Sequence, residues 1–159
     1  MIFIVLGSQK FQFNRLLKYI DELISENKIM GTVVAQCGHS DYTPQNYKGV
    51  PFYNQDEFKR IVSDADIIIT HAGTGAIITA LKNNKKVIAM PRLKDYAEHV
   101  DNHQIQIVKN FVKKNYILEA HDKDSLLKGI SNIKNHQFAK FKSNNSAYIN
   151  TIKDFLINE

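Results

Sequence analysis

The chain has 159 residues, of which 43% are hydrophobic, so it can bury the core of one domain but is too short for two. It carries 21 Lys and Arg against 16 Asp and Glu, and the resulting net charge of +5 favours anionic partners without identifying them. Cys37 is the only cysteine, which excludes an intrachain disulfide and suits a reducing cytoplasm, and no apolar run approaches the ~20 residues of a membrane-spanning helix.

The first predicted element is a strand at residues 1–6, an apolar run without the basic lead and the length of a signal peptide. Residues 13–27 follow with apolar side chains at helical spacing, so one face of this predicted helix packs on a sheet. Short β-branched runs then alternate with amphipathic segments, as in βαβ units. The other predicted strands are 32–37, 50–53, 67–70, 87–90 and 116–118. The other predicted helices are 55–63, 75–83, 102–114, 124–133 and 146–157.

We therefore predict a single Rossmann-like α/β domain over residues 1–159, with a parallel sheet flanked by helices. The nearest feature to a linker is the polar stretch 134–145. Beyond it, residues 146–159 are expected to form a terminal helix that closes the core or contacts a partner. Asp124 is the predicted N-cap of the preceding helix.

The first candidate site is Gly7-Ser8-Gln9, which follows the first predicted strand. In open α/β sheets ligands lie beyond the carboxyl ends of the strands, where a glycine lets the backbone approach them closely. A tight strand-to-helix turn without a ligand explains this tripeptide about as well. The full G-x-G-x-x-G pattern is absent, which argues against a dinucleotide site.

The second candidate is the turn at residues 71–76, which follows the apolar strand 67–70 directly. Because a helix is expected to start at about Gly75, several backbone N–H groups point outward at the positive end of its dipole. Such a turn suits a diphosphate, and Thr74 adds a hydroxyl donor. The alternative is a glycine turn needed only for packing between strand and helix.

The third candidate is the long polar loop at residues 90–104, since loops of this length in a compact domain are mostly functional or disordered. Asn102, His103 and Gln104 lie at the expected start of a helix, where amide and imidazole groups can hold sugar hydroxyls. Asp101 or Asn102 also suits the N-cap of that helix, and the two roles are compatible.

Two other kinds of site are weaker. His99 and His103 have the i, i+4 spacing of a helical zinc pair, but H-E-x-x-H is absent and no third ligand is indicated, so we expect no metal. Cys37 with His39 is a poor nucleophile pair, and Cys37 is expected to pack as a small apolar residue. Without a basic stripe interleaved with aromatics, we also expect no nucleic acid partner.

The second and third candidates together resemble the C-terminal domain of glycosyltransferase family 28. The resemblance runs from Met1 to about Leu118, and its most specific parts are residues 65–75, Pro91-Arg92 and residues 98–104. It is greatest for the small stand-alone members. These are donor-binding subunits of split GT-B transferases, in dolichol-linked sugar synthesis and in bacterial capsule and exopolysaccharide clusters.

The resemblance implies a site for a UDP-sugar. Gly-Ser-Gln would face the donor, the segment Pro51-Phe52-Tyr53 would present backbone atoms to the uracil, and His103-Gln104 would hold the sugar. Thr79 stands where the family often has a glutamate on the ribose, so ribose recognition is expected to be weaker, water-mediated or supplied elsewhere. The expected substrate-binding residues are Gly7, Ser8, Gln9, Phe52, Tyr53, His71, Gly73, Thr74, Gly75, Thr79, Arg92, His99, Asn102, His103 and Gln104.

The resemblance also implies a partner. Full-length relatives carry the acceptor site and the catalytic base in an N-terminal domain, and in split systems a membrane-anchored subunit provides both. We therefore expect a cytoplasmic chain that reaches the membrane and a lipid-linked acceptor through that subunit, and we assign no catalytic residue here. No cofactor is expected, because the amides at residues 73–76 would stabilise the diphosphate leaving group. The alternative is a non-catalytic accessory protein that enhances a complete transferase.

Overall fold

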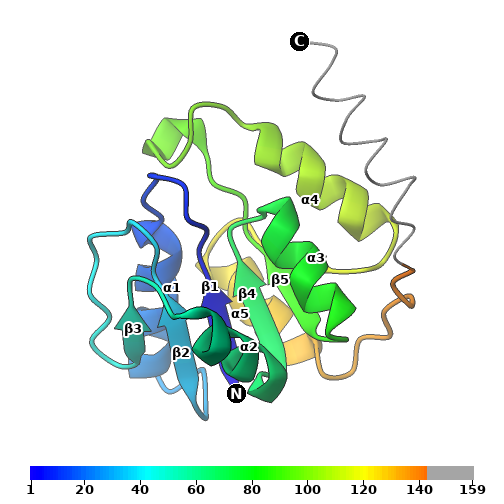
Figure 1. Ribbon diagram of the computed structural model, residues 1–159, viewed down its shortest axis with the longest axis horizontal. Helices are drawn as coiled ribbons and strands as arrows, with labels where there is room; N and C mark the ends of the chain where they lie inside the picture. Colours follow the sequence, from blue (N-terminus) through cyan, green and yellow to red (C-terminus); the bar gives the residue numbers. More distant parts are fainter. Residues whose placement is uncertain (143–159) are drawn as a thin grey trace.

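The computed structural model describes residues 1–142, so the predicted helix at 146–159 lies outside the described residues. Six strands form one parallel sheet in the order β3-β2-β1-β4-β5-β6, with β1 beside β4 near its centre (Figure 1). This is the strand order of doubly wound nucleotide-binding folds, and it confirms the predicted Rossmann-like architecture. The strands are β1 (Ile2–Val5), β2 (Val33–Gln36), β3 (Lys48–Val50), β4 (Ile67–Thr70), β5 (Lys86–Ala89) and β6 (Leu118–Glu119).

Helices cover both faces of the sheet. Apolar residues of α1 and α5 pack in one core cluster, and those of α2, α3 and α4 pack in a second cluster on the opposite face. Because both faces are covered, β1 and β4 are buried at every position. The helices are α1 (Asn14–Ser25), α2 (Gln55–Asp64), α3 (Thr74–Lys82), the short 3-10 helix η1 (Lys94–Tyr96), α4 (His103–Lys113) and α5 (Lys123–Asn132).

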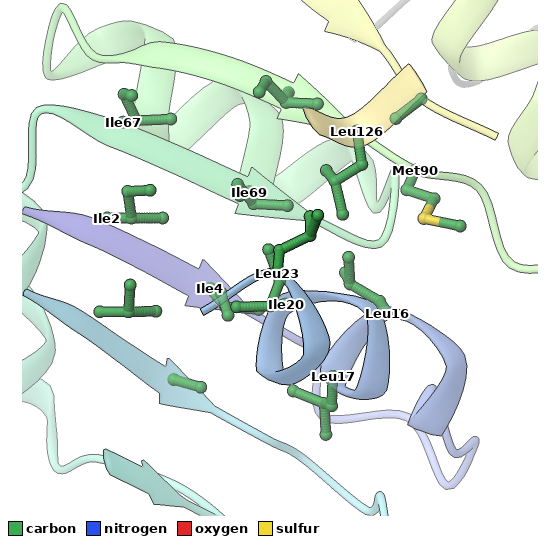
Figure 2. Close-up of a cluster of buried hydrophobic side chains, with 14 of the residues drawn as sticks. Ile2, Ile4, Leu16, Leu17, Ile20, Leu23, Ile67, Ile69, Met90 and Leu126 are labelled. Atoms are coloured by element: carbon green, nitrogen blue, oxygen red, sulfur yellow. The ribbon is translucent and has the colours of Figure 1, made fainter. Parts of the chain in front are cut away.

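The apolar stripe of α1 fills the first core cluster. Leu16, Leu17 and Ile20 are fully buried, and Figure 2 shows them gathered over Ile4 of β1 and Ile69 of β4. Burial of each such side chain stabilises the fold by roughly 1.5–3 kcal/mol. The helical spacing noted in the sequence therefore fixes how α1 lies on the sheet.

Three predicted elements were misplaced. The last strand, predicted at residues 116–118, lies at Leu118–Glu119, because these are the residues that pair with β5. The strand predicted at residues 50–53 ends at Val50, because Pro51 has no N–H to give to the ladder. The N-cap of α5 is Asp122 and not Asp124, since the Asp122 carboxylate accepts a hydrogen bond of 2.8 Å from the Ser125 N–H. The Ser125 hydroxyl in turn accepts one from the Asp122 N–H, which completes a capping box.

The longest helix among residues 1–142 is α1, with 12 residues. No helix in this part of the chain has the length and apolar character needed to cross a bilayer.

Candidate functional site

A cavity of about 500 Å³ lies at the carboxyl ends of β1 and β4, the upper edge of the sheet in Figure 1. The connections from these two central strands leave in opposite directions, and the crevice between such connections is where open α/β sheets bind ligands. The volume is within the range of small-molecule sites. A hollow at the opposite edge of the sheet, beside Met1 and Asp66, holds about 280 Å³.

Ten of the fifteen predicted site residues line this cavity. They come from the β1–α1 loop, the β4–α3 turn and the segment that leads into α4, and they are Gly7, Ser8, Gln9, His71, Gly73, Thr74, Gly75, His99, His103 and Gln104. The other five, Phe52, Tyr53, Thr79, Arg92 and Asn102, lie outside its lining. Three stretches far apart in the sequence therefore meet at one edge.

The N-terminus of α3 opens into the cavity. Gly73 is the N-cap and provides no side-chain hydrogen bond to the first turn, which consists of Thr74, Gly75 and Ala76. The N–H groups of a first helical turn have no partner within the helix and lie at the positive end of the dipole. The structure thus leaves this end of α3 open to an anion, at the turn where the sequence predicts a diphosphate.

The His71 imidazole packs between two glycines. A Cβ atom added at Gly7 would lie 2.8 Å from both Cε1 and Nε2 of His71, and one added at Gly73 would collide with Nε2. The sequence suggested that these glycines let the backbone approach a ligand. The structure gives another reason for them, which is room for the His71 ring. Gly75 differs, because a Cβ added there would meet no atom of residues 1–142 within 4 Å.

His71 is neutral at physiological pH. Burial, reinforced by the charge of Arg92, lowers the pKa of its imidazole to about 4. Its Nδ1 lies 3.3 Å from both the Val5 carbonyl oxygen and the Thr70 Oγ1, and because the Thr70 hydroxyl already donates to that carbonyl at 3.0 Å, a proton on Nδ1 finds an acceptor in both. Nε2 is therefore left as a hydrogen-bond acceptor beside the glycine turn.

The segment before α4 forms the far wall. Asp101 Oδ1 accepts a hydrogen bond of 2.9 Å from the His103 N–H and lies 3.1 Å from Nδ1 of His99. The hydrogen bond from the His103 backbone is the main reason why the pKa of Asp101 is lowered. Since α4 begins only at His103, His99 is not on the helix and the two do not form the helical zinc pair considered above. Among residues 1–142, no group of three or more metal-ligating side chains comes together.

Arg92 lies beneath this wall and is fully buried. Its backbone N–H donates to Gln104 Oε1 at 3.0 Å, and its Nη2 donates to the Phe11 carbonyl oxygen at 3.0 Å. Within residues 1–142, Nε and Nη1 have no hydrogen-bond partner. Burial lowers the pKa of the guanidinium to about 10, with Glu98 opposing the shift, so Arg92 stays charged. Its charge can act on the cavity only from behind the lining.

The remaining predicted residues have other surroundings. Phe52 is 45% exposed and its ring meets His39 edge-on at 5.3 Å between centroids. Tyr53 packs against Phe3, and Thr79 is on the exposed face of α3. Asn102 closes its own loop, since its Oδ1 accepts from the Lys94 N–H at 3.0 Å.

Gln36 was not predicted, yet it links the strands beside the cavity. Its Nε2 donates to the Leu6 carbonyl oxygen at 3.1 Å, and its Oε1 accepts from the Tyr53 N–H at 3.2 Å. No motif marks it, because its role depends on β1, β2 and the β3–α2 turn ending at one edge. Cys37, the next residue, is buried as expected, and burial raises the pKa of its thiol to about 11.

The model of the glycosyltransferase family 28 C-terminal domain matches residues 1–156. The chain belongs to this family. Relatives of this family 28 domain include the UDP-N-acetylglucosamine transferase subunit ALG13 of Candida albicans, 32% identical over 99 residues, which are 62% of this chain and 32% of the relative. The subunit of the same name from Saccharomyces cerevisiae is 35% identical over 71 residues, 44% of this chain and 33% of the relative. The chain thus spans about a third of the length of these relatives.

Solved structures show the same fold. An NMR structure of ALG13 superimposes with a TM-score of 0.61 at 20% identity and covers 92% of each chain. MurG of Acinetobacter baumannii gives a TM-score of 0.60 at 17% identity, over 84% of this chain and 41% of MurG. A UDP-GlcNAc 2-epimerase of Methanocaldococcus jannaschii, solved with UDP-GlcNAc and UDP, gives 0.61 at 14% identity, over 97% of this chain and 45% of the epimerase. The family 28 domain therefore has the architecture of the C-terminal half of GT-B glycosyltransferases.

Proposed function

We propose that this chain is the donor-binding subunit of a two-component glycosyltransferase that moves a hexose or N-acetylhexosamine from a UDP-sugar to a lipid-linked acceptor in polysaccharide biosynthesis. The observation that carries the proposal is the cavity at the carboxyl ends of β1 and β4, with the uncapped N-terminus of α3 opening into it. Membership of family 28 supports a nucleotide diphosphate as the anion.

In this proposal the diphosphate lies at the N–H groups of the first turn of α3, with Thr74 as a further donor. None of the residues that line the cavity within the described part of the chain is Lys or Arg, so helix amides stabilise the leaving group and Arg92 adds its charge from behind. The sugar lies toward the opposite wall, where His103 and Gln104 line the cavity. We propose that Phe52 and Tyr53 meet the uracil beside this cavity.

The catalytic base and the acceptor site belong, in this proposal, to a membrane-anchored partner subunit. The relatives are themselves named as subunits of a UDP-N-acetylglucosamine transferase, which supports a partner and makes UDP-N-acetylglucosamine the first donor to test. We place the partner contact at residues 146–159. A chain that ends at Asn145 should bind UDP like the full chain and should no longer co-purify with its partner.

Isothermal titration of the full chain with UDP, and then with UDP-N-acetylglucosamine, tests the proposal. We expect both to bind, and we expect ADP, which carries the same diphosphate on another base, to bind more weakly. A chain that binds no uridine nucleotide would contradict the donor-binding function and would favour an accessory protein that enhances a complete transferase. A chain that binds UDP and ADP equally would contradict uracil recognition.

A further inference from the structure

A buried ion pair connects the start of α1 to the loop before α4, which carries one wall of the cavity. Arg15 is in the first turn of α1, and Glu98 lies between η1 and α4. Arg15 Nε donates to Glu98 Oε1 at 2.8 Å and Nη2 donates to Oε2 at 2.8 Å, while the side chains are only 11% and 1% exposed. A two-pronged contact between guanidinium and carboxylate fixes orientation as well as distance, which a lysine cannot do.

The pair also organises the backbone around it. Glu98 Oε2 accepts from the Leu93 N–H at 2.9 Å, which closes the loop on itself. Arg15 donates further to the carbonyl oxygens of Pro91 at 3.2 Å and His121 at 2.9 Å. One side chain of α1 therefore holds the β5–α4 loop at two points and the segment after β6 at a third.

Neither Arg15 nor Glu98 lines the cavity, yet the next residue does. His99 follows Glu98 directly, and its ring lies 4.8 Å from the ring of Phe11 in the β1–α1 loop. The wall at residues 99–104 therefore keeps its place relative to Gly7–Gln9 through contacts behind the cavity surface. If the Arg15–Glu98 fork is lost, three contacts to the β1–α1 loop remain: the Phe11–His99 ring contact, Gln12 Nε2 on the Tyr96 carbonyl oxygen at 3.1 Å, and Arg92 Nη2 on the Phe11 carbonyl oxygen at 3.0 Å.

Stability alone is a poor reason for such a pair, because the cost of removing both charges from water offsets most of their attraction. We infer that Arg15 and Glu98 are positioning residues that set the sugar-facing wall of the cavity and so determine how much affinity the sugar adds to that of UDP. This inference rests on the proposed function. The diphosphate seat on α3 is on the other side of the cavity and does not depend on the pair.

Arg15→Lys tests the inference, because it keeps the charge and removes the fork. Calorimetric titration of wild type and variant with UDP, and with UDP-N-acetylglucosamine, gives the ratio of the two affinities. We expect UDP affinity to stay within about twofold and UDP-N-acetylglucosamine affinity to fall about tenfold, since a displacement near 1 Å is enough to spoil polar recognition. Glu98→Gln, which preserves size and one oxygen, should give a smaller change in the same direction.

Lys123→Met is the matched control. Lys123 also links α1 to another segment through ion pairs, with Glu22 at 3.0 Å and Glu26 at 2.8 Å, and none of these three residues lines the cavity. The ratio of UDP-N-acetylglucosamine affinity to UDP affinity in the Lys123→Met variant should equal that of wild type. An unchanged ratio in a folded Arg15→Lys chain, or an equal loss for both ligands, would overturn the positioning role while leaving the donor site in place. A wild-type chain that binds neither ligand would overturn the proposed function and this inference with it.

Discussion

Replacement of Gly75 by alanine separates the stability of α3 from its affinity for an anion. Gly75 is the second residue of the helix after its N-cap Gly73, and a Cβ atom there meets nothing within 4 Å in the part of the chain that the structure describes. Alanine is favoured over glycine in a helix by up to about 1 kcal/mol. For a domain of this size that corresponds to a rise in Tm of roughly 2–4 °C. The folded chain alone therefore gains from the substitution.

The same methyl group stands where the diphosphate would approach the first turn. Loss of one hydrogen bond to a charged group costs about 1.5–3 kcal/mol, or roughly 10- to 100-fold in UDP affinity. Gly73→Ala should behave differently, because its Cβ would collide with His71 Nε2 and lie 2.7 Å from Cε1, so that stability and binding fall together. The pair of variants distinguishes a glycine needed for a ligand from one needed for packing.

Differential scanning calorimetry and titration with UDP measure the two effects on the same samples. Asn132→Ala in α5 serves as the control, since it improves helix propensity at an exposed position far from the cavity and should raise Tm without changing UDP affinity. A Gly75→Ala chain with raised Tm and undiminished UDP affinity would show that the diphosphate does not lie on this turn.

Three further substitutions have definite expected outcomes. Gln104→Ala leaves the buried Arg92 N–H without its 3.0 Å acceptor, so urea denaturation should show a loss of about 1–3 kcal/mol, and titration should show a larger loss for UDP-sugar than for UDP. The pKa of His71 is about 4 in the folded chain and 6.5 in the unfolded chain, so between these pH values the unfolded chain binds one more proton than the folded chain. Stability should therefore fall by about 3 kcal/mol as the pH drops from 6.5 to 4, and His71→Gln should abolish that part of the slope. Burial alone would raise the pKa of Asp21, but hydrogen bonds from Tyr42 and from the backbone of residues 45–46 outweigh burial and lower it. The stability that this carboxylate contributes is therefore lost as the pH falls below about 4. Between pH 6 and 3 the urea midpoint of Asp21→Asn should change less than that of the wild type.

The sequence predicted correctly those strands and helices whose own apolar pattern matches the face that they bury. The continuous apolar run before His71 and the helical spacing of the leucines of α1 were clear in the sequence, and they form a buried strand and a buried helix face. The strand at Lys48–Val50 could not be predicted in place, because Lys-Gly-Val has no alternation and is ordered by pairing with β2. The apolar residues that follow Pro51 have the stronger strand pattern, which is why the strand was predicted at residues 50–53 instead.

For the candidate site too, the sequence predicted some residues and missed others. Motifs next to the glycine turn identified the residues that line the cavity, because the carboxyl ends of parallel strands must share an edge. Arg15 gave no signal, since a lone arginine on an amphipathic helix is ordinarily a solvated charge, and only the fold brings it to Glu98, 83 positions away. Arg92 was predicted as a ligand contact, but side-chain burial is decided by packing that no motif records.

Because α1 carries core leucines as well as Arg15, the proposed positioning role means that a change in α1 can alter the preference for a sugar without changing a residue that lines the cavity. A substitution on the buried face of this helix that shifts it along the sheet would carry Arg15, and with it the β5–α4 loop, by the same amount. Mutational libraries aimed at new sugar preferences should therefore include the sheet-facing positions of α1. Variants selected there would be expected to keep every residue that faces the ligand.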